Sequence, residues 1–342
     1  MSEGLQNVLI VKLSALGDVI HALPVSYAIK ETFPDAKVTW VVEPPSLELL
    51  KMNPCVDKII LFNKKNFRTL KGFMREFFPF KQELQQQSYD AVLDLQGLFK
   101  SAAIAFFAKS NIKLGICNMR EMSDKISKPV VGEHAQGHIV ERYLDTARAV
   151  GCVVDKVVFP LQVPVKESES ARAIMEQAGL RGGNPFVTFV VGANWPNKRW
   201  PTKNFAALGD WFYGLAVVPV LVGNGDLDAQ RAQEIESQME IPPINLVNRT
   251  NIAQLTHVIR SSRLVIGGDT GPVHLGAALG VRTVMLMGPT NVERNGPFGQ
   301  LQNAVEVERA CKGCWKRACP KDEDCLDKIP VAFVEDKIKS MG

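Results

Sequence analysis

The sequence lacks any apolar run that approaches the roughly 20 residues needed to cross a bilayer, and residues 1–6 lack the basic start and apolar stretch of a signal peptide. We therefore expect a cytoplasmic protein. A large excess of charge is also missing, because 40 basic and 36 acidic side chains leave a net charge of only +4. This balance excludes a general nucleic-acid-binding protein, and it leaves room for one local basic patch.

Low-complexity tracts are absent too, and apolar residues are abundant. A chain of 342 residues with 46% hydrophobic content is long enough for two domains, each with its own core. Seven cysteines could suggest a disulfide framework, but Cys55, Cys117 and Cys152 are scattered singly along the chain. Reduced thiols are therefore expected at these three positions.

Short apolar strands alternate with segments long enough for crossover helices, in two successive series. The first series has predicted strands at 7–14, 37–43, 58–62, 91–95 and 113–116, and its longest helical segment at about 67–87. The second begins with a helix near 168–179 and has predicted strands at 185–191, 216–222, 245–247, 264–268 and 283–287. This alternation predicts an α/β fold of two facing Rossmann-like domains, each built on a mostly parallel sheet.

Two prolines and a break in the pattern between 152 and 167 predict the connection between the domains. We place the first domain at 1–160 and the second at 161–342. Ligands of open parallel sheets bind at the carboxyl ends of the strands, so we expect the active site there, in the cleft between the domains.

The first predicted strand is followed by Gly17 and Asp18, which place a turn and a carboxylate at a carboxyl strand end. Asp at a helix start is often only a cap or a complement to the helix dipole, and this interpretation stays open. No G-x-G-x-x-G pattern follows the strand, so the dinucleotide-binding fingerprint is missing.

A glycine-rich turn, GGDTGPVH at 267–274, follows a predicted strand and opens an apparent helix. Glycines let the backbone approach a ligand closely, and the N–H groups of a helix start favour phosphate oxygens, so the pattern indicates a diphosphate site. Thr270 would add a hydroxyl donor, and His274 lies one turn into the helix. Alternatively, Asp269 and Thr270 are simple caps and His274 is a satisfied core imidazole.

The loop NWPNKRWP at 194–201 follows another predicted strand and combines two adjacent cations with indoles and stiffening prolines. Lys198 is suited to neutralise a nucleoside diphosphate leaving group. The alternative is a solvated surface lysine beside a packed Trp200.

Four motifs in this order resemble those of glycosyltransferase family 9, the ADP-heptose:lipopolysaccharide heptosyltransferases. They are IVKLSALGDVIHALP at 10–24, YDAVLDLQGLFKS at 89–101, KRWP at 198–201 and GDTGPVH at 268–274. The resemblance implies a metal-independent glycosyltransferase of the GT-B type, with an acceptor domain first and a nucleotide-sugar domain second. It implies Asp18 as the catalytic base, ADP-heptose as co-substrate and no cofactor. The donor would be bound by six residues: Asn194, Lys198, Asp269, Thr270, Gly271 and His274.

The same resemblance implies inverting transfer of L-glycero-D-manno-heptose to the inner core of lipopolysaccharide, on Kdo or on the first heptose, and we favour Kdo. Because that acceptor is lipid-linked, we expect peripheral contact with the cytoplasmic face of the inner membrane. We also expect a monomer. A family member that uses another nucleotide sugar and a non-catalytic nucleotide-sugar or lipopolysaccharide binding protein are the alternatives.

Five basic side chains between 64 and 75 have only Glu76 as an acidic neighbour, which favours an anionic acceptor, although a solvated helix face stays open. By the resemblance, the acceptor would contact six residues: Lys12, Lys64, Arg68, Lys100, Ser101 and Arg120. Four phenylalanines of the same segment belong either to the core or to a surface that faces a lipid-linked acceptor: Phe73, Phe77, Phe78 and Phe80.

Two positions depart from the family pattern. Leu227 occupies the place of an acidic residue near the ribose, and either Asp226 or Asp228 could replace it. Ala193 stands where the family often has a hydroxyl side chain, which removes one phosphate donor.

Four cysteines lie close together near the carboxyl end: Cys311, Cys314, Cys319 and Cys325. Their number suggests zinc or an iron–sulfur cluster, but their spacing is not that of a standard finger. Similar clusters occur in this family without a part in the transfer chemistry, so a structural metal, a disulfide pair and free thiols all stay open. We predict no metal at the active site, and a metal or redox protein is the competing class.

Overall fold

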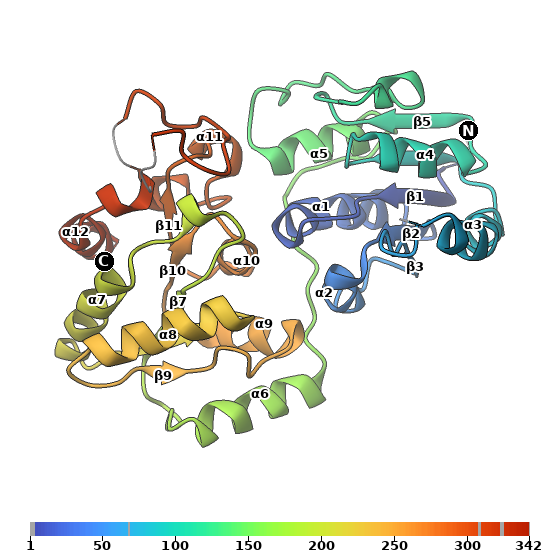
Figure 1. The fold of residues 1–342 in the computed structure, drawn as a ribbon. Coiled ribbons are helices and arrows are strands. Elements are labelled where there is room, and N and C mark those ends of the chain that lie inside the picture. The colour runs from blue at the N-terminus through green and yellow to red at the C-terminus, as the bar shows by residue number, and fades with distance from the viewer. Residues whose placement is uncertain (1–3, 68, 307–308, 322–324, 342) are drawn as a thin grey trace. The chain divides into compact units, whose positions relative to one another are not determined.

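The computed structural model describes residues 4–67, 69–306, 309–321 and 325–341. The chain divides into two compact units, Met1–Gln162 and Val163–Gly342 (Figure 1). Each unit has a six-stranded sheet with helices between its strands. The predicted α/β class with two Rossmann-like sheets is therefore confirmed.

In the first unit the strand order is β3-β2-β1-β4-β5-β6, and all neighbours are parallel. The strands are β1 (Asn7–Val11), β2 (Lys37–Val42), β3 (Lys58–Leu61), β4 (Ala91–Asp94), β5 (Ile112–Gly115) and β6 (Lys128–Pro129). The α-helices are α1 (Leu16–Thr32), α2 (Leu47–Lys51), α3 (Leu70–Leu84), α4 (Phe99–Phe107) and α5 (Ile139–Arg148).

The two faces of this sheet carry different helices. The connection from β1 to β2 runs in one direction along the sheet and the connection from β4 to β5 in the other, so right-handed crossovers place α1 and α4 on opposite faces. Helix α1 packs against α5. Leu84 of α3 and Ile104 of α4 share one buried cluster with the strands. Helices α3 and α4 therefore cover the same face.

The second unit repeats this plan with the order β12-β11-β10-β7-β8-β9, again with parallel neighbours. Its strands are β7 (Phe186–Val190), β8 (Val218–Val222), β9 (Ile244–Asn245), β10 (Val265–Gly268), β11 (Thr283–Met287) and β12 (Ala304–Glu306). Its α-helices are α6 (Val165–Gln177), α7 (Thr202–Gly214), α8 (Asp226–Gln238), α9 (Ile252–Ser261), α10 (Gly271–Ala278), α11 (Val292–Asn295) and α12 (Val331–Ser340).

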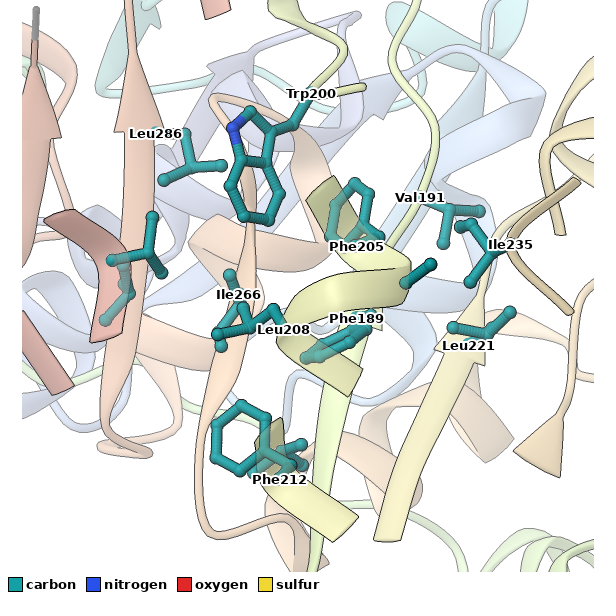
Figure 2. Packing of buried hydrophobic residues seen from close by; sticks show 14 of the residues in the cluster. Phe189, Val191, Trp200, Phe205, Leu208, Phe212, Leu221, Ile235, Ile266 and Leu286 are labelled. Carbon is teal, nitrogen blue, oxygen red and sulfur yellow. The ribbon is translucent and has the colours of Figure 1, made fainter. Parts of the chain in front are cut away.

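The core of the second unit is rich in aromatic side chains. Figure 2 shows Phe205 and Phe212 of α7 close to Phe189 of β7, and the ring centroids lie 5.4 and 5.9 Å from that of Phe189. Trp200 is buried against Phe205, and its indole N–H donates to Ile329 O over 2.9 Å. Burying each such side chain stabilises the fold by roughly 1.5–3 kcal/mol, so this cluster holds the loop before α7 firmly on the sheet.

Two edge strands were not predicted, because strands of two and three residues are too short to show a sequence period. β6 pairs only Leu114 with Lys128 and Gly115 with Pro129, and proline is tolerated there because an edge strand needs no donor on its outer side. Helix α6 also begins inside the segment predicted as the domain connection. Within the residues that the structure describes, no helix combines the length and apolar character of a transmembrane span.

Candidate functional site

Two predicted donor residues of the second unit, and Thr290, which the sequence did not single out, follow three neighbouring strands. Lys198 lies in the loop after β7, Asp269 directly follows β10, and Thr290 lies three residues after β11. Because the strands are parallel and adjacent, their carboxyl ends meet at one edge of the sheet. The fold therefore brings together side chains from three separate loops.

Asp269 is the centre of this cluster. Its Oδ2 lies 2.5 Å from Lys198 Nζ and 2.6 Å from the Thr290 hydroxyl, and its Oδ1 lies 2.6 Å from His274 Nε2. Burial alone would raise the pKa of Asp269, but the hydrogen bonds and charges of His274 and Lys198 outweigh it and hold the pKa far below its usual range. Asp269 is therefore an anion at neutral pH and fixes the Lys198 ammonium.

The backbone around Lys198 is held on all sides. Arg231 donates to Val191 O over 2.8 Å and also to Trp200 O, so one guanidinium ties both ends of the loop. Lys198 Nζ lies 4.5 Å from the centroid of the Trp195 indole. Any side chain at Gly268 would overlap Lys198 O, so glycine permits the close approach of β10 to this loop. Lys198 is thus oriented before any ligand arrives.

The start of α10 adds donors next to Asp269. Thr270 is extended and precedes the helix, and the first N–H of a helix, here that of Gly271, has no acceptor within the helix. The buried Thr270 hydroxyl has no hydrogen-bond partner among the described residues. A buried hydroxyl without a partner beside a helix start suits an anionic ligand. Asn194 is exposed, four residues before Lys198.

The family pattern has an acidic residue near the ribose, and the loop after β8 shows where Asp226, Leu227 and Asp228 lie. Leu227 is 45% exposed, and Asp226 begins α8. The Asp228 carboxylate instead accepts the Asn224 N–H over 2.9 Å, and any side chain at Gly192 would overlap it. Asp228 therefore lies at the carboxyl edge, between the loops that follow β7 and β8.

In the first unit, Asp18 lies in the first turn of α1 and is half-buried. Its Oδ2 accepts the Ala15 N–H over 3.2 Å, so it does cap the helix, and this bond engages one of its two oxygens. Gln96 Oε1 accepts the N–H groups of Leu13 and Ser14 over 3.1 and 3.2 Å. The loop before Asp18 is thus tied to the carboxyl end of β4.

A buried carboxylate that the sequence did not single out organises the basic cluster. Glu43 directly follows β2 and is 4% exposed. Its Oε1 lies 2.8 Å from Lys100 Nζ, and its Oε2 lies 3.1 Å from Lys64 Nζ. Both lysines are partly exposed, so Glu43 presents two cations at the carboxyl edge of the first sheet. Glu43 could have been predicted as a site residue from the sequence, because it stands directly after a buried strand.

The other predicted acceptor residues lie in different environments. Lys12 is buried, with its ammonium 2.8 Å from the Tyr143 hydroxyl and 3.2 Å from Leu95 O. Ser101 is fully buried, and its hydroxyl lies 2.8 Å from Leu98 O and 3.0 Å from Asp94 Oδ2. Arg120 is exposed, and Arg68 lies outside the described residues. The structure therefore places Lys64 and Lys100 together and sets Lys12 and Ser101 behind the surface.

All seven cysteines are free thiols. In the described ranges, no group of three or more His, Cys, Asp or Glu side chains is arranged to hold a metal ion. Burial raises the pKa of Cys152 to about 12, so this thiol stays protonated.

Comparison with known proteins adds to this geometry. The profile of glycosyltransferase family 9 (heptosyltransferase) matches residues 77–324. Lipopolysaccharide heptosyltransferase 1 of Pseudomonas aeruginosa is 30% identical over 333 residues, which cover 93% of this chain and 89% of that protein. A family 9 glycosyltransferase from Veillonella parvula superposes with a TM-score of 0.84 at 22% identity, covering 100% of this chain and 98% of that one. The Escherichia coli heptosyltransferase WaaC, solved with ADP-2-deoxy-2-fluoro heptose, superposes with a TM-score of 0.74 at 22% identity, covering 98% of this chain and 100% of that one.

Proposed function

This chain belongs to glycosyltransferase family 9, the heptosyltransferases, and we propose that it transfers L-glycero-D-manno-heptose from ADP-heptose to the inner core of lipopolysaccharide. The observation that carries the proposal is the fixed Lys198–Asp269 pair beside the start of α10, with the Thr270 hydroxyl ready for a ligand. The match to the P. aeruginosa lipopolysaccharide heptosyltransferase 1 supports lipopolysaccharide as the acceptor. The basic cluster of the first unit favours Kdo as the sugar that receives the heptose.

The second unit, Val163–Gly342, which corresponds to the predicted domain 161–342, would bind the donor. Lys198 and the N–H groups and hydroxyl at Thr270 and Gly271 would contact the diphosphate, and Asn194 would approach it from the same loop. Fixed charges and dipoles stabilise the leaving ADP without reorganising during the reaction, so no metal ion is required. His274 would act through Asp269, because its Nε2 bonds that carboxylate. We propose Asp228 as the acid near the ribose, since its carboxylate lies at the carboxyl edge.

The first unit, Met1–Gln162, which corresponds to the predicted domain 1–160, would bind the acceptor. Lys64 and Lys100, held by Glu43, suit the carboxylates of an acidic sugar such as Kdo. Arg120, which is exposed, would extend this basic surface, and Arg68 stays a predicted acceptor residue. Lys12 and Ser101 would support the site from behind. A lipid-linked acceptor would require peripheral contact with the cytoplasmic face of the inner membrane, and we propose that the protein acts there as a monomer.

Asp18 would serve as the base. It would take the proton of the attacking acceptor hydroxyl while that oxygen forms a bond to the anomeric carbon and the bond from this carbon to the ADP oxygen breaks. Attack from the face opposite ADP inverts the configuration. One oxygen of Asp18 bonds Ala15 N–H, and this contact holds the carboxylate in place at the helix start.

Asp18→Asn tests this role, because asparagine can keep the capping acceptor but cannot take a proton. A general base contributes about a hundred- to ten-thousandfold in rate, so turnover of ADP-heptose should fall by that factor while ADP affinity stays unchanged. Asp35→Asn, at an exposed turn, is the control. Full turnover in Asp18→Asn would show that Asp18 only caps helix α1 and is not the base. Kdo-lipid A and its monoheptosylated form, offered separately, identify the acceptor.

A further inference from the structure

We propose that one face of the first unit, formed by α3 and α4, is the surface that docks on an anionic lipid bilayer. This aromatic face consists of Phe73, Met74, Phe78, Phe99 and Phe106. The purpose of docking, to bring the enzyme to a lipid-linked acceptor, rests on the proposed function, but docking itself does not. Binding to lipid can be measured without any substrate.

Large apolar side chains are unusually exposed on this face. Five phenylalanines are exposed in the described part of the chain, and four of them lie here. Phe78 and Phe106 are 62% and 60% exposed, and Met74 is 59% exposed. Single exposed apolar residues are ordinary, but a contiguous group marks an interaction surface.

Ring contacts through Phe77 and Phe107 connect Phe73, Phe78 and Phe106. Phe77 and Phe107 join the two helices, with ring centroids 5.1 Å apart, and Figure 1 shows α3 and α4 as neighbours in the first unit. Phe73 stacks on Phe77 at 4.9 Å, and Phe106 contacts Phe107 at 5.2 Å. Phe107 packs against the buried cluster under these helices. The exposed rings therefore stand on a fixed base.

Helical spacing aligns the remaining members. Met74 and Phe78 are four residues apart on α3, and Phe99 and Phe106 are seven residues apart on α4. Both separations place side chains on one side of a helix. Each helix thus contributes a row of apolar side chains.

The segment that carries these rows has an excess of positive charge. Residues 64–113 contain nine basic and four acidic side chains, a net charge of +5, although the whole chain carries only +4. Lys81 Nζ lies 5.3 Å from the Phe107 centroid and Lys113 Nζ 5.9 Å from that of Phe106. Lysine stems beside aromatic rings can lie along lipid tails while their ammonium groups meet anionic headgroups. This complementarity identifies an anionic membrane as the partner.

The aromatic face also adjoins the acceptor cluster. Phe99 and Lys100 are consecutive at the start of α4, and Lys100 is bound to Glu43 at the carboxyl edge of the sheet. The sugar of a lipid-linked acceptor could bind near Lys100 while its lipid stays in the bilayer that Phe99 contacts. Docking and acceptor binding would therefore use neighbouring residues without sharing one.

Vesicle co-sedimentation of the full chain tests the proposal. The protein should bind vesicles of phosphatidylcholine mixed with phosphatidylglycerol, bind pure phosphatidylcholine weakly, and be released by salt. The double variant Phe78→Ser/Phe106→Ser should bind about tenfold more weakly or worse. Phe333→Ser is the matched control, because Phe333 is 61% exposed on α12 of the second unit. Thermal unfolding checks that each variant is folded.

Three outcomes would overturn docking: no vesicle binding by the unchanged protein, equal losses in Phe333→Ser, or a face that instead holds two copies of the chain together. Heptose transfer gives a second readout. The double variant should keep its transfer rate on a water-soluble Kdo acceptor and lose it on the same sugar in vesicles. Vesicle binding by a protein that transfers no heptose would reject the proposed function and leave docking intact.

Discussion

Asp269→Asn tests the donor site most directly, because it removes one charge and hardly changes volume. The carboxylate now meets Lys198, Thr290 and His274, each within 2.6 Å. Asparagine keeps one acceptor oxygen and turns the other into an amide donor, which must face one of these groups. Lys198 then loses its counter-charge in a place where its side chain is only 13% exposed.

The expected loss of stability follows from this burial. Breaking a buried ion pair by removing one partner costs about 3–5 kcal/mol. Because Lys198 retains some access to water, we expect the lower end, about 3 kcal/mol. Thr290→Val removes only a neutral hydroxyl from the same oxygen and should cost about 1.5 kcal/mol, the lower end for a hydrogen bond to a charged group, so it is the matched control.

The pH dependence gives a second signature of the same group. Asp269 has a lowered pKa in the folded protein, so the folded state binds this proton more weakly than the unfolded state does. Its contribution is complete above the ordinary value of 3.8 and is lost as the pH falls below that value. The difference between the unchanged protein and Asp269→Asn should therefore be constant near neutral pH and shrink below about pH 4.

Urea unfolding followed by tryptophan fluorescence measures this difference. Four of the five tryptophans, Trp195, Trp200, Trp211 and Trp315, belong to the second unit, so the signal reports the unit that holds Asp269. ADP titration on the same samples measures donor affinity, which should fall as Lys198 loses its orientation. A loss no larger than that of Thr290→Val, or a difference that persists unchanged at pH 3, would refute the assignment of the pair as a fixed, buried anion site.

Two further predictions concern the acceptor and the metal. Lys100→Met should raise the KM for a water-soluble acceptor about tenfold without changing ADP affinity, because it removes one of the two cations that Glu43 holds. Steady-state kinetics measures this, with Lys51→Met at an exposed position as the control. An unchanged KM would contradict the prediction. Turnover should be the same before and after dialysis against EDTA, because Lys198 and the start of α10 supply the fixed positive charge that stabilises the leaving ADP. A loss of turnover that Mg²⁺ restores would show that a metal ion takes part.

The sequence predicted the central strands well because each is a short run of buried residues with a clear end, and it missed the edge strands β6 and β12. The same pattern placed Asp18, Lys198 and Asp269 just after strand ends, where a parallel sheet collects its polar side chains. It could not predict partners: Lys12 and Tyr143 are 131 residues apart, and Lys100 and Glu43 are 57 residues apart. Lys12 therefore looked accessible in the sequence, and Glu43 looked ordinary.

Burial of the Lys198–Asp269 pair bears on why the pair exists. A buried ion pair often contributes no more stability than apolar residues of similar volume, because both charges lose their water. Stability alone is thus a weak reason to place Asp269, Lys198 and His274 together under a strand end. A lysine held in one orientation can stabilise the charge of a departing diphosphate without moving during the reaction. If the pair serves the donor, changes in the first unit at Asp18 or Lys100 should leave ADP affinity intact, and only changes around Asp269 should weaken it.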